Sequence, residues 1–161
     1  EVEEIKRDWV EMTLDKYKNE VPLKAGAKEF LDELKKREVK MGIATSNSRE
    51  IVHAVLSSLG VEGYFHQVLT SCDVKRGKPS PDIYLTCAEK LEVEPKNCLV
   101  FEDVVAGILA GKRANMQVCA IEDAHSADMR EEKKALADYY IKDYKNCQQW
   151  FVGGKNENCN Y

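Results

Sequence analysis

The segment Cys98-Leu99-Val100-Phe101-Glu102-Asp103 decides the fold, because it joins a continuous apolar run to a pair of acids. Such a run is typical of a strand in a parallel sheet, which is buried on both faces. A helical pattern follows over about residues 104–114, and a second apolar strand follows at Gln117–Ile121. This alternation of strand, helix and strand predicts an α/β fold of three layers, with a parallel sheet between two layers of helices.

The rest of the chain continues the alternation. Residues 40–45, 67–71 and 139–141 have the length and composition of strands, and helical spacing predicts helices over about 25–36, 49–59 and from 80 onward. Asn47 is expected to cap the second of these helices and Ser80 the third, with Pro81 at its first position. Residues 1–19 also show helical spacing, the mixed charges of residues 130–134 indicate a solvated helix face, and the tail beyond Val152 is polar.

Composition excludes several classes of function. The 161 residues are 43% hydrophobic and 32% charged, as in an ordinary soluble globular domain. The net charge of −4 leaves no basic excess for binding nucleic acid, and no apolar run approaches the roughly 18 residues of a membrane span. The six cysteines lack the spacing of a zinc site, so we expect reduced thiols and a cytoplasmic location.

Polar residues lie where these elements meet. Thr45-Ser46-Asn47 ends a strand and precedes a helix, Lys78 lies between Gly77 and Pro79, and Glu102-Asp103 ends the clearest strand. Taken singly, these features fit a helix cap, a solvated loop lysine and a solvent-facing acid beside a cap. Taken together, they supply anion contacts at a helix N-terminus, a phosphate-binding lysine and hard oxygen ligands for Mg²⁺. Phosphoryl transfer needs these ingredients, because its catalysis is mostly positioning and charge neutralisation.

Three motifs carry a resemblance to a known family. GIATSNS (42–48), GKPSPDIY (77–84) and FEDVVAGILAGKRANM (101–116) resemble the second, third and fourth motifs of the haloacid dehalogenase (HAD) superfamily of phosphohydrolases. The similarity is greatest to its branch with a helical cap, which includes phosphoglycolate phosphatase-like enzymes and β-phosphoglucomutase. A HAD-like Rossmannoid core is implied for residues 21–152, preceded by the end of a helical cap (1–20) and followed by a flexible tail (153–161).

The resemblance also implies roles for individual residues. Thr45 would hydrogen-bond the transferring phosphoryl group, with Ser46 and Asn47 lining its pocket, and Lys78 would neutralise phosphoryl oxygens. Asp103 would ligate Mg²⁺, and Glu102 would ligate it or orient its waters. The stretches 48–49 and 73–76 would lie near the substrate entrance.

The first motif of the family, an Asp-x-Asp pair that supplies the nucleophile and the general acid/base, does not occur in this sequence. The strand that carries it would lie between the strands ending at Thr45 and Phe101. We therefore expect a truncated chain, inactive alone, whose complement comes from a missing N-terminal segment or another chain.

Three functions remain open at this stage. The first is a Mg²⁺-dependent phosphatase that acts on a small phosphorylated metabolite through an aspartyl-phosphate intermediate. The second is a phosphosugar mutase of the β-phosphoglucomutase type, and the third is a catalytically inactive scaffold. The oligomeric state is not predicted.

Overall fold

The computed structural model describes residues 12, 15–16, 21–145 and 147. Most of the helix predicted over residues 1–19, and the whole tail beyond residue 147, therefore lie outside the described residues. No helix in the described part of the chain is both long enough and apolar enough to span a bilayer.

The strands form two parallel sheets. β1 (Gly42–Ala44) pairs with β2 (Gln67–Leu69), and β3 (Leu99–Glu102), β4 (Gln117–Ile121) and β5 (Tyr139–Ile141) form a second sheet in that order. β3 pairs with β4 from Leu99 opposite Gln117 to Glu102 opposite Ala120. All five strands lie within the predicted segments or one residue beyond them.

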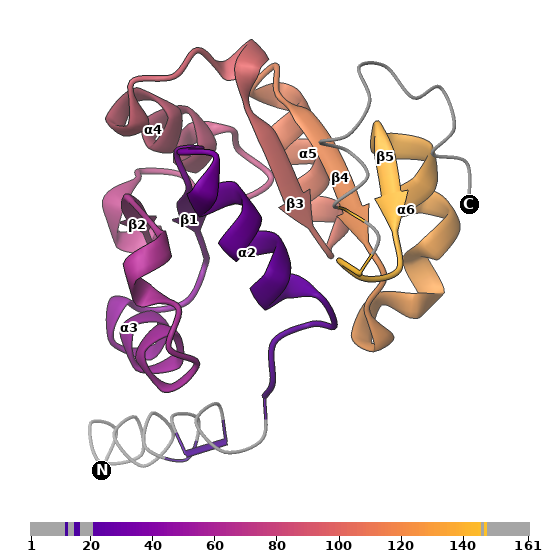
Figure 1. Cartoon of the computed structure of the whole chain (residues 1–161). Coiled ribbons are helices and arrows are strands. Elements are labelled where there is room, and N and C mark those ends of the chain that lie inside the picture. The colour runs from indigo at the N-terminus through magenta and orange to yellow at the C-terminus, as the bar shows by residue number, and fades with distance from the viewer. Residues whose placement is uncertain (1–11, 13–14, 17–20, 146, 148–161) are drawn as a thin grey trace, which may run out of the picture.

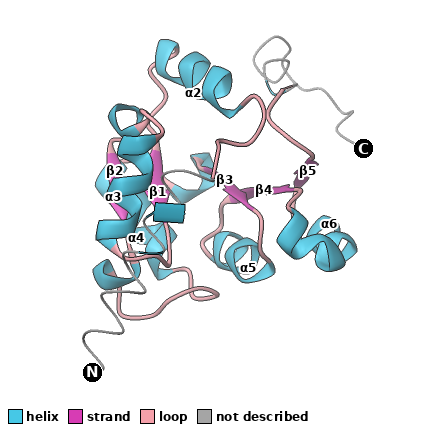
Figure 2. Cartoon of the chain, turned by 90° about the horizontal axis from the view of Figure 1, so that it is seen from below, coloured by secondary structure: helices cyan, strands magenta, loops and turns pink. Residues whose placement is uncertain are grey.

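The helices are α2 (Ala27–Lys36), α3 (Arg49–Ser58), α4 (Asp82–Leu91), α5 (Val105–Arg113) and α6 (Arg130–Leu136). α4 packs on β1 and β2, α5 on β3 and β4, and α6 on β5 and α5. Figure 2 shows α2 on one side of the strands and α5 and α6 on the other. The predicted three-layer α/β/α arrangement is confirmed.

Three local predictions were wrong. Ser48, not Asn47, caps α3, because Ser48 has the extended backbone of a cap and its side chain accepts from the Ile51 N–H at 3.4 Å. Pro81 precedes α4 in the cap position, and the Ser80 hydroxyl donates instead to the Asp82 carboxylate. In α6, Lys133 was expected on a solvated helix face, but its side chain is fully buried.

Figure 1 shows β1 and β2 as one group of strands and β3, β4 and β5 as another. A cavity of about 670 Å³ lies between the two sheets. It is bordered by β1, β3, α2 and α4, and apolar side chains such as Ile43, Val100 and Phe101 line it. Within the described residues, no strand pairs with β1 on the side opposite β2, or with β3 on the side opposite β4. This is the position at which the sequence analysis expects a further strand.

Gly26 lies next to Ala27, one of the residues that line this cavity. It precedes α2 at φ 77°, a conformation that favours glycine, and a Cβ built on it would lie 2.5 Å from the Lys145 backbone nitrogen. The neighbouring Ala25 carbonyl accepts from the Tyr144 N–H at 2.9 Å. The Tyr144 ring then stacks on Phe30, with 5.3 Å between ring centroids. The glycine therefore lets the segment after β5 approach the start of α2.

We predict that Gly26→Ala lowers the free energy of unfolding by about 2–4 kcal/mol, because it combines left-handed strain with a clash against backbone. Gly60→Ala is a matched control for strain alone, since Gly60 has φ 65° but nothing within 4 Å of its Cβ position. It should cost about 1 kcal/mol. Gly63→Ala, with neither feature, should be close to neutral. Urea unfolding curves measure all three, and equal costs at Gly26 and Gly60 would contradict the close approach.

Candidate active site

Lys78 joins the carboxyl ends of the two sheets. It lies on the loop before α4, and its ammonium donates to the Ala44 carbonyl at the end of β1, 3.1 Å away. The same ammonium forms an ion pair with Glu102 at the end of β3. The side chains are only 12% and 8% exposed, respectively, so the pair is screened little by water. The structure therefore brings together three of the segments singled out in the sequence.

Glu102 is buried, so the interpretation of this residue as a solvent-facing acid was wrong. The Tyr84 hydroxyl, from α4, donates to the same carboxylate oxygen that Lys78 contacts. Burial, with the nearby Glu102 charge, raises the pKa of Tyr84 far above its ordinary value, so its hydroxyl stays protonated as a donor. Gly107 in α5 makes room for this carboxylate, because a Cβ there would collide with the carboxyl group of Glu102.

Thr45 lies directly after β1, where its N–H donates to the Leu69 carbonyl at 3.0 Å. Its hydroxyl oxygen accepts from the Asn47 N–H at 3.1 Å, which leaves the hydroxyl hydrogen to donate outward. Ser46 and Asn47 are exposed in the turn that leads into α3. The end of β1 therefore holds a hydroxyl donor, exposed polar residues and the N-terminus of α3. Lys78 binds the carbonyl of Ala44 at the same strand end.

A second ion pair connects the loops after β1 and β2. Arg49 contacts the Asp73 carboxylate at 2.6 Å, and Asp73 also accepts from the Thr70 N–H and hydroxyl. These hydrogen bonds, those from Thr70 first, hold the pKa of Asp73 below its ordinary value. The arrangement fixes the loop on this side, which the sequence analysis placed near the entrance.

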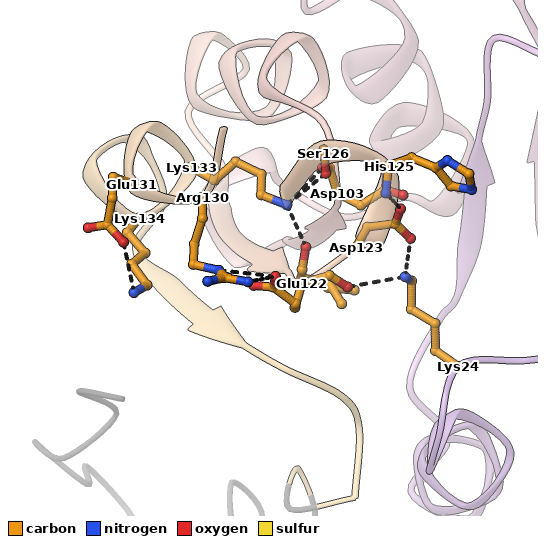
Figure 3. Close-up of polar contacts among 11 residues, drawn as sticks. Lys24, Asp103, Glu122, Asp123, His125, Ser126, Arg130, Glu131, Lys133 and Lys134 are labelled. Atoms are coloured by element: carbon orange, nitrogen blue, oxygen red, sulfur yellow. Dashed lines mark hydrogen bonds and ion pairs between the residues drawn. The ribbon is translucent and has the colours of Figure 1, made fainter. Parts of the chain in front are cut away.

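Asp103 follows Glu102, and its position is set through its backbone. The Asp103 carbonyl accepts from the Ser126 hydroxyl at 2.7 Å and from the Lys133 ammonium at 3.2 Å (Figure 3). Val104, not Asp103, occupies the cap position of α5, so the interpretation of Asp103 as a cap was wrong. The hydrogen bonds described for Asp103 end on its carbonyl, which leaves the carboxylate available for a cation.

The carboxylate oxygens of Asp103 and Glu102 are the type of ligand that Mg²⁺ prefers, but only one of the two carboxylates is available to bind it. Mg²⁺ takes one or two carboxylates and keeps several waters or phosphate oxygens. Asp103 fits this description, whereas Glu102 is already held by Lys78 and Tyr84. Within the described residues, no group of three or more His, Cys, Asp or Glu could hold a metal.

Sequence reasoning missed three polar residues here. The hydroxyl of Tyr84 donates to Glu102, a residue 18 positions away in the sequence. Ser126 and Lys133 carry no motif, and only the helical spacing of residues 130–136 could have placed Lys133 inward.

We predict that Tyr84→Phe lowers the free energy of unfolding by about 1–3 kcal/mol, because it leaves the buried Glu102 carboxylate with one donor fewer. Tyr140→Phe is the matched control, since within the described residues the buried Tyr140 hydroxyl has no hydrogen-bond partner. It should be neutral or slightly stabilising. Thermal unfolding of both variants checks this, and equal losses would contradict a structural role for the Tyr84 hydroxyl.

This chain is similar in sequence and fold to several known proteins. Validoxylamine A 7'-phosphate phosphatase from Streptomyces hygroscopicus subsp. limoneus is 39% identical over 128 residues, covering 80% of this chain and 58% of the relative. CbbY from Rhodobacter sphaeroides, in complex with phosphate, superposes with a TM-score of 0.80 at 25% identity, over 90% of this chain and 65% of that one. A putative beta-phosphoglucomutase from Thermotoga maritima gives a TM-score of 0.68 at 29% identity, over 80% and 59%.

The chain therefore spans less than two thirds of the length of each of these proteins. The model of the family described as haloacid dehalogenase-like hydrolase matches residues 1–121, which include Thr45, Lys78, Glu102 and Asp103. On this match, and on the fold that its solved relatives share, the chain belongs to the haloacid dehalogenase-like hydrolase family.

Proposed function

We propose that this chain forms most of the core of a Mg²⁺-dependent phosphatase for a small phosphorylated metabolite. The observation that carries the proposal is the buried Lys78 ammonium, held between the end of β1 and Glu102 and next to Thr45. A lysine that is buried at a strand edge beside a helix N-terminus is suited to a phosphate group. The names of relatives such as validoxylamine A 7'-phosphate phosphatase support the substrate class.

The residues present would bind and orient a phosphoryl group. Thr45 would donate its hydroxyl hydrogen to one phosphoryl oxygen, and Ser46 and Asn47 would add polar contacts from the turn. Lys78 would place its positive charge against the same group. Asp103 would hold Mg²⁺, which would supply further charge neutralisation when bound, and Glu102, held by Lys78 and Tyr84, would help to orient its waters. Catalysis by such a site is positioning plus electrostatic stabilisation.

The nucleophile of an aspartyl-phosphate mechanism would come from an Asp-x-Asp pair, which this sequence does not contain. We infer that an extended segment that carries this pair, and that is not part of these 161 residues, occupies the cavity between β1 and β3. The cavity supports this, because apolar side chains line it and parallel strands border it on two sides. A strand parallel to both would bring its carboxyl end to Lys78 and Asp103.

A phosphosugar mutase is the second candidate. Two solved structures that superpose on this chain are named as beta-phosphoglucomutases, from Thermotoga maritima (putative) and Clostridium difficile, at 29% and 25% identity. An assay with β-glucose 1-phosphate distinguishes the two functions, once the chain is supplied with the segment that carries the Asp-x-Asp pair. Phosphatase action releases inorganic phosphate, whereas mutase action moves the phosphoryl group within the sugar.

We predict that Lys78→Met destabilises the chain by about 3–5 kcal/mol, because it leaves the Glu102 carboxylate buried without its partner. The double variant Lys78→Met with Glu102→Gln removes both charges, and it should recover most of that loss. Both variants should nevertheless bind inorganic phosphate about tenfold more weakly than the unaltered chain, since a charge-assisted contact is gone. Isothermal titration with phosphate and Mg²⁺ measures this.

Lys90→Met is the matched control, since Lys90 is exposed near the C-terminal end of α4, whereas Lys78 precedes the N-terminal end of that helix. It should change neither stability nor phosphate binding. If the stable double variant bound phosphate like the unaltered chain, Lys78 would have only a structural role and the proposed site would be wrong.

A further inference from the structure

Lys133 is a buried lysine that the proposed reaction does not use. Its side chain has 0% exposure, although it lies on α6 among charged residues that face solvent. The ammonium donates to the Ser126 hydroxyl at 2.8 Å, to the Ile121 carbonyl at 3.1 Å and to the Asp103 carbonyl at 3.2 Å. Its three hydrogens therefore meet three oxygens, none of which carries a formal charge.

The position of these oxygens relates Lys133 to the sheet. The described pairing of β3 with β4 ends at Glu102 opposite Ala120, so the next pair in register would be Asp103 and Ile121. Lys133 donates to the carbonyls of those two residues. The ammonium thus bridges the two strands at the point where their ladder stops, and it holds the Asp103 peptide there.

Ser126 completes the arrangement. Its side chain accepts from Lys133 and donates to the Asp103 carbonyl at 2.7 Å, so two donors converge on one oxygen (Figure 3). Ser126 is itself only 5% exposed. Two side chains from the segment after β4 therefore fix the direction in which the chain leaves β3, and with it the Asp103 side chain.

The acids near Lys133 are paired with other cations. Glu122 is bound by Arg130, and Asp123 by Lys24 at 2.5 Å. The hydrogen bonds from Arg130, and more weakly the charges of Arg130 and Lys133, lower the pKa of Glu122. Within the described residues, Lys133 has no ion pair of its own. Burying an ammonium in this way is costly, and an apolar residue of similar length would avoid the cost.

We infer that Lys133, with Ser126, is a positioning residue that orients the Asp103 carboxylate for a divalent cation. The inference rests on the proposed function, because it takes Asp103 as a metal ligand. Mutation of a residue that orients a metal ligand through hydrogen bonds weakens metal binding by about 10- to 100-fold. A role in packing alone would change stability and leave the affinity of the folded chain unaltered.

The test measures Mn²⁺ binding by the 161-residue chain, with free Mn²⁺ followed by electron paramagnetic resonance. The variants are Lys133→Met, Ser126→Ala and Asp103→Asn, at a temperature where circular dichroism shows each to be folded. Lys134→Met is the matched control, because Lys134 is next along α6 and contacts only Glu131 and the Tyr140 ring among the described residues.

Lys133→Met should weaken Mn²⁺ binding by about tenfold or more, and Ser126→Ala should weaken it in the same direction. Lys134→Met should bind like the unaltered chain. Because Lys133 acts through Asp103, adding Lys133→Met to Asp103→Asn should produce no further loss.

Unchanged Mn²⁺ affinity in folded Lys133→Met would overturn the inference, and if that variant does not fold, Ser126→Ala decides in its place. A different failure would concern the proposed function. If Asp103→Asn binds Mn²⁺ like the unaltered chain, Asp103 is not a metal ligand, and both the metal assignment and the role of Lys133 are wrong.

Discussion

The ion pair between Lys78 and Glu102 is the interaction on which the candidate site depends. The two sheets are separated by an apolar cavity, and Lys78 links their carboxyl ends by binding Ala44 and Glu102 at once. A buried ion pair contributes little net stability, because desolvation of both charges offsets their attraction. Its value here is geometric, since it places a positive charge at the edge where Thr45 and Asp103 also lie.

Two lysines, one largely buried and one fully buried, flank the acidic pair at the end of β3. Lys78 contacts the side chain of Glu102, and Lys133 contacts the backbone of Asp103. The adjacent carboxylates thus differ in environment: Lys78 and Tyr84 hold Glu102, whereas no hydrogen bond to the Asp103 carboxylate is found among the described residues. This difference suits a site in which Asp103 binds a cation while Glu102 stays paired with Lys78.

Much of this could be predicted from the sequence, because local patterns encode it. Apolar runs such as Val118–Ile121 mark strands, and the residues at strand ends meet at one edge of a parallel sheet whatever the details of packing. Long-range partners could not be predicted. Nothing near Tyr84 signals its contact with Glu102, and the charged sequence around Lys133 is typical of a solvated face.

The cap of α3 was predicted wrongly for a related reason. Asn47 and Ser48 are both good caps by type, and the choice depends on which backbone is extended, a property set by how β1 enters the turn. The gap between the two sheets, in contrast, could be anticipated from the family resemblance, which places the strand of the missing Asp-x-Asp motif between β1 and β3.

The proposed enzyme requires that a strand with an acid pair, inserted between β1 and β3, completes this site. The most direct measurement is Mg²⁺-dependent phosphate release from sugar phosphates by the chain fused, through a Gly/Ser linker, to an apolar strand ending in Asp-x-Asp. The matched control ends in Asn-x-Asn. We expect phosphate release by the Asp fusion and negligible release by the Asn fusion or by the chain alone. Measurable release at the same rate by all three would place the nucleophile within these 161 residues, and no release by the Asp fusion would mean that the strand does not complete the site.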